Sequence, residues 1–290
     1  MTPWQQQLHR WARLACRMDV LSPKPGNVSP GREFSGATVA DFLQSADAIA
    51  PVLATAPGNP LGRTILLSAK ATRNVVAHNT NLGIILLLAP LAAVPEEISL
   101  HDGISGILNT TTVQDAENTY AAIRLMNPGG LGTAPEQDVH EAPSITLLEC
   151  MQLAAARDQI ALQYHQSFRG ILDHGLAWLA AAAEQTSDQP QQIVLLALQM
   201  LRHWGDSLIA RKCDAATSDR VREMAAAVLR AGWPHTSQSV TLLQTLDTFL
   251  RDEQHTRNPG TTADLVAATL FAAQREQIFV PGAEWNAAFP

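Results

Sequence analysis

The spacing of apolar residues restricts the fold of this chain more than any other feature of its sequence. Through most of the 290 residues, apolar positions recur three and four apart, and the alternation typical of a half-buried strand is missing. Alanine and leucine are abundant, and runs of β-branched residues are rare. A chain of this length is near the size at which one core stops growing. The sequence therefore predicts an all-α fold, a single-domain bundle of about ten helices over residues 1–290.

Capping residues mark where the first helices begin. Thr2, Pro3 and Gln5 have the order of an N-cap, a first-turn proline and a capping box. Thr38 with Asp41 opens a second helix that is expected to reach about residue 52. Further helices are expected at about 62–76, 81–93, 113–126, 145–165, 168–184, 190–203, 217–231, 236–252 and 262–276.

The expected helix over 145–165 contains an irregularity. Its apolar residues cover one broad face, and three polar residues interrupt that face, namely Arg157, Asp158 and Gln159. A polar connection follows the next expected helix, over residues 184–192.

Charge and hydropathy exclude two classes of partner. The net charge of −7 argues against a nucleic-acid binder, which would carry a basic face. The most apolar run, over residues 84–94, is broken by Pro90 and is too short to span a bilayer. We therefore expect a core helix there and no membrane partner. A polyanionic small molecule is not excluded, because a local cluster of arginines or a metal ion can hold one.

The cysteines and the first residues indicate the compartment. Cys16, Cys150 and Cys213 are odd in number and far apart, which is typical of a reduced, cytoplasmic chain without a disulfide framework. The first residues are polar and lack the pattern of a signal peptide. A homodimer is the ordinary expectation for an enzyme of this size.

The strongest motif leads from Arg257 into the last predicted helix. Its Asn-Pro-Gly turn ends at Gly260, which lets a ligand approach the backbone, and Thr261 or Thr262 can cap the helix. The N–H groups of such a first turn form an anion site, and Asp264 would repel the anion unless a Mg²⁺ ion bridged the two. The alternative is a well-capped helix whose dipole Asp264 complements.

A second motif is the loop 22–32, which contains three prolines and two glycines. Prolines fix the backbone, and a stiff loop that presents Lys24 and Arg32 is suited to hold phosphate. The alternative is a solvent-exposed linker.

Two further motifs carry amides and charges at expected helix starts. Asn79 and Asn81 can read a nucleobase or ribose edge, because an amide offers both a donor and an acceptor; the alternative is an N-cap with an Asx turn. In 205–212, Asp206 can serve as metal ligand or base, with Arg211 and Lys212 on phosphate. The alternative for that segment is an N-capped surface helix with solvated charges.

Other patterns are weaker. Asp115 and Glu117 are two positions apart, so they point in different directions on a helix and only one of them can face a site. The Gly-rich turn 127–132 lacks the P-loop and Rossmann spacings. The nine histidines show no pairing typical of a zinc site, and no nucleophile elbow of the G-x-S-x-G type is present.

The four main motifs occur in the same order in the triphosphoribosyl-dephospho-CoA synthase family, which this chain resembles from about residue 10 to about residue 276. The resemblance implies an all-helical enzyme that takes ATP and 3′-dephospho-CoA and releases adenine. It also implies transfer of the triphosphoribosyl group to the dephospho-CoA ribose, with Mg²⁺ as the expected cofactor.

The sequence departs from the family pattern at three places. Residues 32–38 replace the family's Gly-Ala-His-x-Asp-Met stretch, and the Asn79–Gly83 segment lacks a His and a Lys that the family carries. Asp19 stands where a glutamate is usual. These changes resemble a divergent branch found in archaea and in some bacteria with methanopterin-type cofactor genes, and they bear on the acceptor more than on the triphosphate.

The resemblance and the motifs together give a set of expected roles. The general base is expected to be Asp206 or Asp19, and Asn79 and Asn81 are expected at the base or ribose. Expected on the phosphates are Lys24, Arg211, Lys212, Arg257, Gly260, Thr261 and Thr262. Expected on Mg²⁺ are Asp264, Asp206 and Asp115.

Three other functions fit parts of the sequence. The same ribose chemistry can serve a different acceptor, such as a pterin-type cofactor precursor, and the lost His and Lys favour this. An N-glycoside hydrolase would use water as acceptor, although the paired adjacent aspartates of helical ADP-ribosyl hydrolases are missing. A non-catalytic helical protein would bind ATP without releasing adenine.

Overall fold

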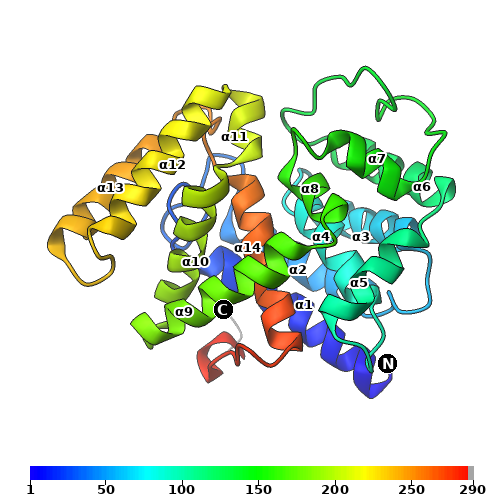
Figure 1. The fold of residues 1–290 in the computed structure, drawn as a ribbon, viewed down its shortest axis with the longest axis horizontal. Coiled ribbons are helices and arrows are strands. Elements are labelled where there is room, and N and C mark those ends of the chain that lie inside the picture. Colours follow the sequence, from blue (N-terminus) through cyan, green and yellow to red (C-terminus); the bar gives the residue numbers. More distant parts are fainter. Residues whose placement is uncertain (287–290) are drawn as a thin grey trace.

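The computed structural model describes residues 1–286, together with all side chains in that range except those of Glu284 and Asn286. Within that range the chain forms fourteen α-helices and no strand, only two isolated bridges, at Ser29–Arg32 and Phe34–Ala37 (Figure 1). The predicted all-α fold is confirmed, with more helices than the expected ten or so.

The α-helices have these bounds: α1 Pro3–Leu21, α2 Val39–Leu53, α3 Leu61–Val75, α4 Leu82–Ala93, α5 Leu100–Asn109, α6 Val113–Met126, α7 Leu147–Ala154, α8 Gln159–His165, α9 Leu176–Gln185, α10 Gln189–Trp204, α11 Ser207–Lys212, α12 Ala215–Arg230, α13 Ser237–Leu250 and α14 Gly260–Arg275. A π-helical turn, η1, spans Gly170–Gly175, and a 3₁₀ turn, η2, spans Ala283–Asn286.

One predicted helix is divided in the structure. The expected helix over 145–165 is wrong as a single element, because the chain leaves the helix after α7 and restarts at α8. The Asp158 carboxylate accepts hydrogen bonds from the N–H groups of Ile160 (2.8 Å) and Ala161 (3.1 Å) and so caps α8. The polar residues that interrupt the apolar face, 157–159, lie at this break.

Two helices were not in the expected set: the short α11, for which a helix was expected only as the alternative, and α5. In α5, Gly103 and Gly106 lower the helical propensity of the sequence. A side chain at Gly103 would meet Val94, since an added Cβ would lie 2.4 Å from its Cγ1 atom. Packing against the end of α4 therefore favours glycine at a position where local preference disfavours a helix.

The centre of the fold consists of α4 and α14, which lie side by side. Every residue of α4 is buried, including Pro90, which confirms that the apolar run 84–94 belongs to a core helix. The first turns of the two helices meet where Asp264 touches Gly83, and their last turns meet at Arg275, so the helices run parallel. None of the helices within residues 1–286 has both the length and the apolar content for crossing a membrane.

Arg275 closes the C-terminal end of this helix pair. Its buried guanidinium donates to four carbonyl oxygens in and after α4, at distances from 2.7 to 3.1 Å. The acceptors are Leu91, Val94, Pro95 and Ile98. Carbonyls at a helix end have no intrahelical partner, and this one side chain satisfies several of them.

A second apolar cluster lies to the left of α14 in Figure 1, where α10, α12 and α13 pack together. Both faces of α10 are buried: Ile193 and Met200 belong to the main core, whereas Val194 and Leu198 belong to the second cluster. Helix α10 therefore joins the α12–α13 hairpin to the rest of the molecule.

Candidate active site

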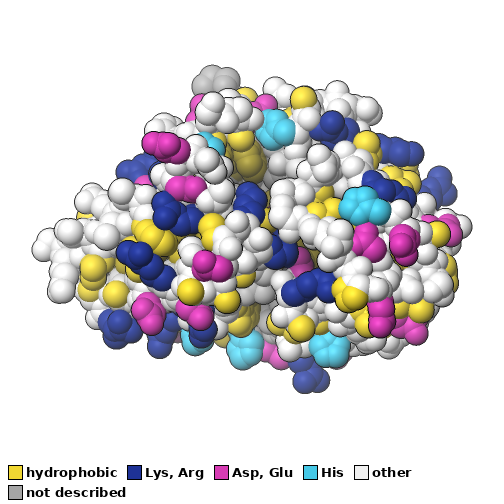
Figure 2. Space-filling model, turned by 90° about the horizontal axis from the view of Figure 1, so that it is seen from above, with side chains coloured by type: hydrophobic (Ala, Val, Ile, Leu, Met, Phe, Trp, Pro, Cys, Tyr) yellow, Lys and Arg dark blue, Asp and Glu magenta, His cyan; other side chains and the backbone are white. Residues whose placement is uncertain are grey.

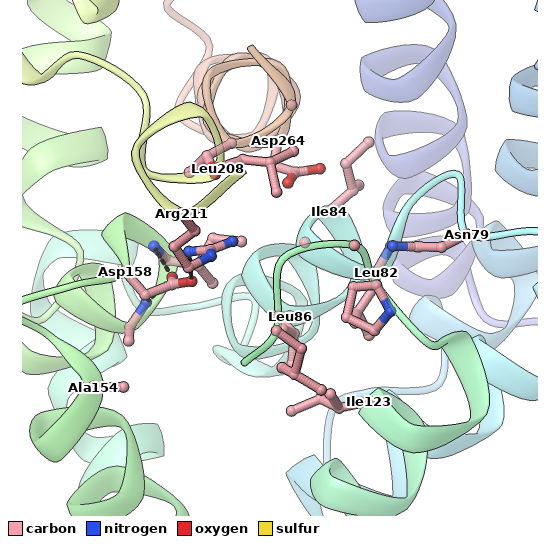
Figure 3. A pocket seen from close by; sticks show the side chains of 18 of the residues that line it. Asn79, Leu82, Ile84, Leu86, Ile123, Ala154, Asp158, Leu208, Arg211 and Asp264 are labelled. Atoms are coloured by element: carbon pink, nitrogen blue, oxygen red, sulfur yellow. Dashed lines mark hydrogen bonds and ion pairs between the residues drawn. The ribbon is translucent and has the colours of Figure 1, made fainter. Parts of the chain in front are cut away.

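A cavity of about 510 Å³ opens where the starts of α4, α8 and α14 meet α6, α7 and α11. Figure 2 shows the corresponding face hollowed near its middle, with Lys and Arg side chains close to the hollow. In Figure 3, Asp264 and Arg211 lie on one side of the cavity, and Leu86 and Ile123 lie on the other. The cavity therefore has a polar side and an apolar side.

Cations from two elements line the polar side. Arg211 forms an ion pair with Asp158, and the Lys212 Nζ atom lies 3.2 Å from the Asn258 Oδ1 atom. Arg157, at the break between α7 and α8, also lines the cavity and is exposed. Burial lowers the pKa of Lys212, while the nearby carboxylates of Asp206 and Asp252 favour its charged form. Positive charge is thus concentrated beside α11.

The start of α14 faces the same side. Its N-cap, Pro259, provides no side-chain cap, and Gly260 and Thr261 line the cavity. Gly260 carries no side chain, and one at that position would collide with Leu208, whose Cδ2 atom would be 2.7 Å from the added Cβ. The Gly260 N–H donates to the Asn258 carbonyl oxygen at 2.9 Å, and the positive dipole end of this 16-residue helix faces the cavity at Thr261.

Asp206 lies behind this wall and does not line the cavity. Its Oδ1 accepts from the N–H groups of Leu208 and Ile209, and its Oδ2 accepts from both the N–H and the hydroxyl of Thr262. The four distances run from 2.8 to 3.1 Å, and the residue is 1% exposed. Both oxygens join α11 to α14 in this structure, and the expected role of Asp206 on Mg²⁺ or as a base stays a prediction. Thr262 is likewise turned away from the cavity.

Asp264 is the carboxylate at the centre of the polar side. Its Oδ2 atom would lie 2.0 Å from a Cβ at Gly83, so only glycine allows this approach to the start of α4. Burial raises the pKa of Asp264 well above its ordinary value, and the negative charges of Asp19, Asp206 and Asp158 raise it further. This carboxylate is held where its negative charge is unfavourable unless a cation is present.

Asp19, near the end of α1, lines the same cavity. Its Oδ1 atom is 3.0 Å from the Lys24 Nζ atom, and both side chains are buried. Burial raises the pKa of Asp19, and Lys24 opposes the rise. Lys24 also donates to the Asp19 carbonyl and is only 1% exposed, so its ammonium group is engaged with Asp19, and its expected contact with phosphate stays a prediction.

Contacts with α13 hold the loop 22–32 in place, in addition to the prolines expected to stiffen it. The Asp247 carboxylate of α13 accepts from the Gly26 N–H (2.8 Å) and pairs with Arg32 and Arg251. Gly26 has a φ of +76°, and an added Cβ would lie 2.6 Å from Leu250. Arg32 is therefore engaged with α13, and the loop contributes Asn27 and Val28 to the cavity lining.

Asn79 and Asn81 both line the cavity, but they have different partners. The Asn79 Oδ1 atom accepts from the Leu82 N–H at 3.0 Å and caps α4. The Asn81 Oδ1 atom accepts from the Thr72 hydroxyl at 3.0 Å. Its Nδ2 atom is buried and has no hydrogen-bond partner among the described residues.

Two expected site residues lie elsewhere. Asp115 belongs to the capping box of α6 and also accepts from the Gly62 N–H at 2.8 Å, so it ties α6 to α3. The Arg257 guanidinium is 4.5 Å from the centre of the Phe249 ring and does not line the cavity. Each side chain is engaged within the fold and neither lines the cavity, and the metal role of Asp115 and the phosphate role of Arg257 stay predictions.

Several polar residues of the lining were not predicted as site residues, and three of them are Arg157, Asp158 and Thr119. Arg157 and Asp158 were noted only as an interruption of an apolar face, and that interruption was the available signal. Thr119 of α6 is fully buried and lines the cavity, and nothing in its sequence neighbourhood distinguishes it. The part of the chain that the structure describes contains no cluster of three or more His, Cys, Asp or Glu side chains suited to a metal.

A helical fold whose cavity combines cations, the start of a long helix and two carboxylates defines an all-α enzyme for a charged small molecule. The chain belongs to the CitG family, ATP:dephospho-CoA triphosphoribosyl transferase, whose sequence profile matches residues 5–281. It is therefore a transferase of the family that the motifs resemble, and the substrates of that family are ATP and dephospho-CoA.

A solved structure has the same fold. It is the crystal structure named as a triphosphoribosyl-dephospho-CoA synthase from Archaeoglobus fulgidus, with 23% sequence identity and a TM-score of 0.64. The similarity covers 81% of this chain and 99% of that chain. No curated protein sequence gives a significant match.

Proposed function

We propose that this enzyme transfers the triphosphoribosyl group of ATP to a ribose hydroxyl of 3′-dephospho-CoA and releases adenine. One observation carries the proposal: Asp19 and Asp264 share a cavity with Arg211, Lys212 and the first turn of α14. The reaction needs cations for a triphosphate and a carboxylate for a hydroxyl proton, and these groups surround one space.

The triphosphate is assigned to the side of the cavity formed by α11 and α14. Lys212 forms a hydrogen bond with the neutral amide of Asn258 and no ion pair within 4 Å among the described residues, so its charge is available to phosphate. Arg211 is paired with Asp158 and is thereby oriented at the cavity wall. The first turn of α14, at Thr261, adds the positive end of a long helix. Positioning of this kind supplies a large share of catalysis in reactions of phosphate-bearing substrates.

The residues present fit a Mg²⁺ ion. Mg²⁺ is usually held by one or two carboxylates together with substrate phosphates, and Asp264 provides a carboxylate beside the cations. The repulsion between Asp264 and Asp19, which contributes to the raised pKa of Asp264, would be relieved by a cation. When bound, the ion would neutralise phosphate charge and orient the triphosphate.

The bond changes at the ribose define the task of the remaining residues. The C1′–N bond to adenine breaks, a bond from C1′ to the acceptor oxygen forms, and the transition state resembles an oxocarbenium ion. Asp19 accepts the proton of the acceptor hydroxyl, for which burial has raised its pKa toward the operating range of a base. Adenine leaves with the bonding electron pair and takes up a proton from solvent.

The apolar side of the cavity suits a long, weakly polar acceptor. Ile123, Leu131, Met151 and Leu153 line it, from α6, α7 and the loop between them. The pantetheine arm of dephospho-CoA has this character. A pterin-type precursor is the second candidate acceptor, favoured by one observation: Asn81 and Leu82, within the segment that lacks the family's His and Lys, both line the cavity.

Adenine release tests the proposal directly. The purified protein is incubated with ATP and Mg²⁺, with and without 3′-dephospho-CoA, and free adenine is quantified by chromatography. Adenine that appears only with 3′-dephospho-CoA supports the transfer. Adenine without it indicates hydrolysis, and no adenine despite ATP binding rules out 3′-dephospho-CoA and directs the search to other acceptors.

A further inference from the structure

Two buried polar groups in the cavity wall have no partner among the described residues. They are the Nδ2 atom of Asn81, which is 4% exposed, and the hydroxyl of Thr119, which is fully buried. Both residues line the cavity, one from the start of α4 and the other from α6. Buried polar groups in folded proteins nearly always have a hydrogen-bond partner, so an unpartnered pair beside a cavity points to a ligand.

The oxygen of the Asn81 amide is engaged by α3. Thr72, a fully buried residue of α3, donates its hydroxyl to the Asn81 Oδ1 atom at 3.0 Å. A hydroxyl can donate to the amide oxygen but can only accept from the amide nitrogen. With the oxygen engaged by Thr72, the group left for the cavity is the N–H₂, which donates and cannot accept.

Capping of α4 does not use the Asn81 side chain. Asn81 occupies the N-cap position, yet its side chain makes no cap bond. Asn79 performs that task from two residues earlier, through its bond to the Leu82 N–H. Asn81 is therefore held by α3 at the start of a 12-residue helix, where the helix dipole favours negative charge.

We propose that the Asn81 N–H₂ group donates a hydrogen bond to a ring nitrogen of the adenine of ATP and supports its departure. This inference rests on the proposed function. A pure donor matches an unprotonated ring nitrogen and does not match the exocyclic amino group of adenine. As the C1′–N bond breaks, its electron pair passes into the adenine ring, so this hydrogen bond strengthens in the transition state. Asn81 itself transfers no proton.

Thr72 is then a positioning residue that acts through Asn81. It does not line the cavity, and its removal would leave the amide free to turn its oxygen toward the adenine. Thr119 lines the same cavity from α6, and its hydroxyl can donate to or accept from a bound ligand.

Kinetics of three variants test the positioning. Thr72→Val keeps the shape but loses the hydroxyl, and its kcat is expected to fall about tenfold while the KM for 3′-dephospho-CoA stays unchanged. Thr72→Ser restores the hydroxyl and is expected within about twofold of the wild type. Ser68→Ala is the matched control, because Ser68 is a buried, unpartnered hydroxyl one turn earlier on α3 and is not part of the lining. Equal activity of Thr72→Val and Ser68→Ala would overturn the inference.

Binding of nucleotide analogues tests the adenine contact without turnover. ATP, 1-deaza-ATP, 3-deaza-ATP and 7-deaza-ATP are titrated by calorimetry in the absence of acceptor. One analogue, which lacks the contacted nitrogen, is expected to bind the wild type about tenfold more weakly than ATP. Asn81→Ala should bind that analogue and ATP equally, and Thr72→Val serves in its place if Asn81→Ala does not fold. Equal affinity of the wild type for all four nucleotides would contradict the contact.

The two proposals fail in different ways. Absence of adenine release by the wild type with 3′-dephospho-CoA refutes the proposed transfer, whereas the analogue titration still decides the adenine contact. Conversely, adenine release that is normal in Thr72→Val and in Asn81→Ala upholds the transfer and refutes the role of Asn81.

Discussion

Two aspartates lie at the start of α14, and their surroundings differ. Asp206 contacts the first turn from outside, and Asp264 belongs to the helix itself. Asp206 is fully buried and accepts four hydrogen bonds, from Leu208, Ile209 and Thr262. Asp264, two residues after Thr262, faces the cavity among the charges of Asp19, Asp158 and Asp206. Burial raises the pKa of both side chains. Hydrogen bonding therefore separates a carboxylate that stabilises the fold from one that is kept available for a cation or a substrate.

Asp264→Asn is expected to give the largest effect of all the variants, a loss of activity together with a gain in stability. Loss of the carboxylate should lower the rate of adenine release about 10³-fold, because the amide cannot hold Mg²⁺ in the same way. The melting temperature should rise, since the neutral amide removes a charge that burial and three other aspartates make unfavourable. The rate is measured by chromatography and the melting temperature by circular dichroism. Unchanged Mg²⁺-dependent ATP binding would show that Asp264 is not a metal ligand.

Asp206→Ala is expected to lower the stability of the protein, whereas Asp264→Asn should raise it. Several buried N–H groups would lose their acceptor, and the free energy of unfolding should fall by ~3 kcal/mol. Thr262→Val, which removes one of the bonds, should cost ~1 kcal/mol. Asp219→Asn is the surface control, because the Asp219 side chain is 66% exposed, and no loss is expected. Urea titrations give these values, and a loss in Asp206→Ala no greater than in the control would refute the structural role.

Gly83→Ala tests the close approach of α4 and Asp264. The added Cβ would lie 2.0 Å from the Asp264 Oδ2 atom, so the carboxylate must move. We expect the affinity for ATP with Mg²⁺ to fall about tenfold. Gly106→Ala is the control in α5, because a Cβ there meets nothing within 4 Å, and it should stabilise the protein by roughly 0.5–1 kcal/mol. Equal ATP affinity of Gly83→Ala and the wild type would count against the placement of Asp264.

The pH dependence of stability should give the smallest effect. Because the pKa of Asp264 is raised in the folded protein, the unfolded chain releases this proton first as the pH rises. Stability without metal should therefore fall with rising pH, from the ordinary range of an aspartate up to the raised pKa. Saturating Mg²⁺ should reduce this fall, with a difference in melting temperature of about 2 °C. Melting curves over that pH range, with and without Mg²⁺, give the measurement. A melting temperature without metal that rose with pH would contradict the predicted direction.

Local signals in the sequence were enough for most of the fold. The capping boxes at Thr2 and Thr38 begin α1 and α2 as predicted, and the apolar run with Pro90 is the core helix α4. Capping depends on residues three apart, so it can be read along the chain. The division at Asp158 and the helix α5 were missed, because a second cap and a packing glycine outweigh local periodicity there.

The cavity was predicted in part. Asp19, Asn79, Asn81, Arg211, Lys212, Gly260, Thr261 and Asp264 all line it, and their roles stay predictions. Lys24, Asp115, Asp206 and Arg257 are engaged elsewhere. Their partners decide this, and a partner such as Thr262 lies 56 positions from Asp206 in the sequence. A motif shows that a polar side chain is present, but only tertiary contacts show whether its hydrogen bonds are already taken.

The four carbonyls bound by Arg275 have a consequence for the electric field of the cavity. Helices α4 and α14 begin at the cavity and end together, with the Arg275 guanidinium on the carbonyls at the end of α4. A buried cation there screens the negative pole of α4, while the positive poles of both helices remain directed at the cavity. The potential at the cavity is thus set partly by an arginine about 18 Å away, the length of a 12-residue helix.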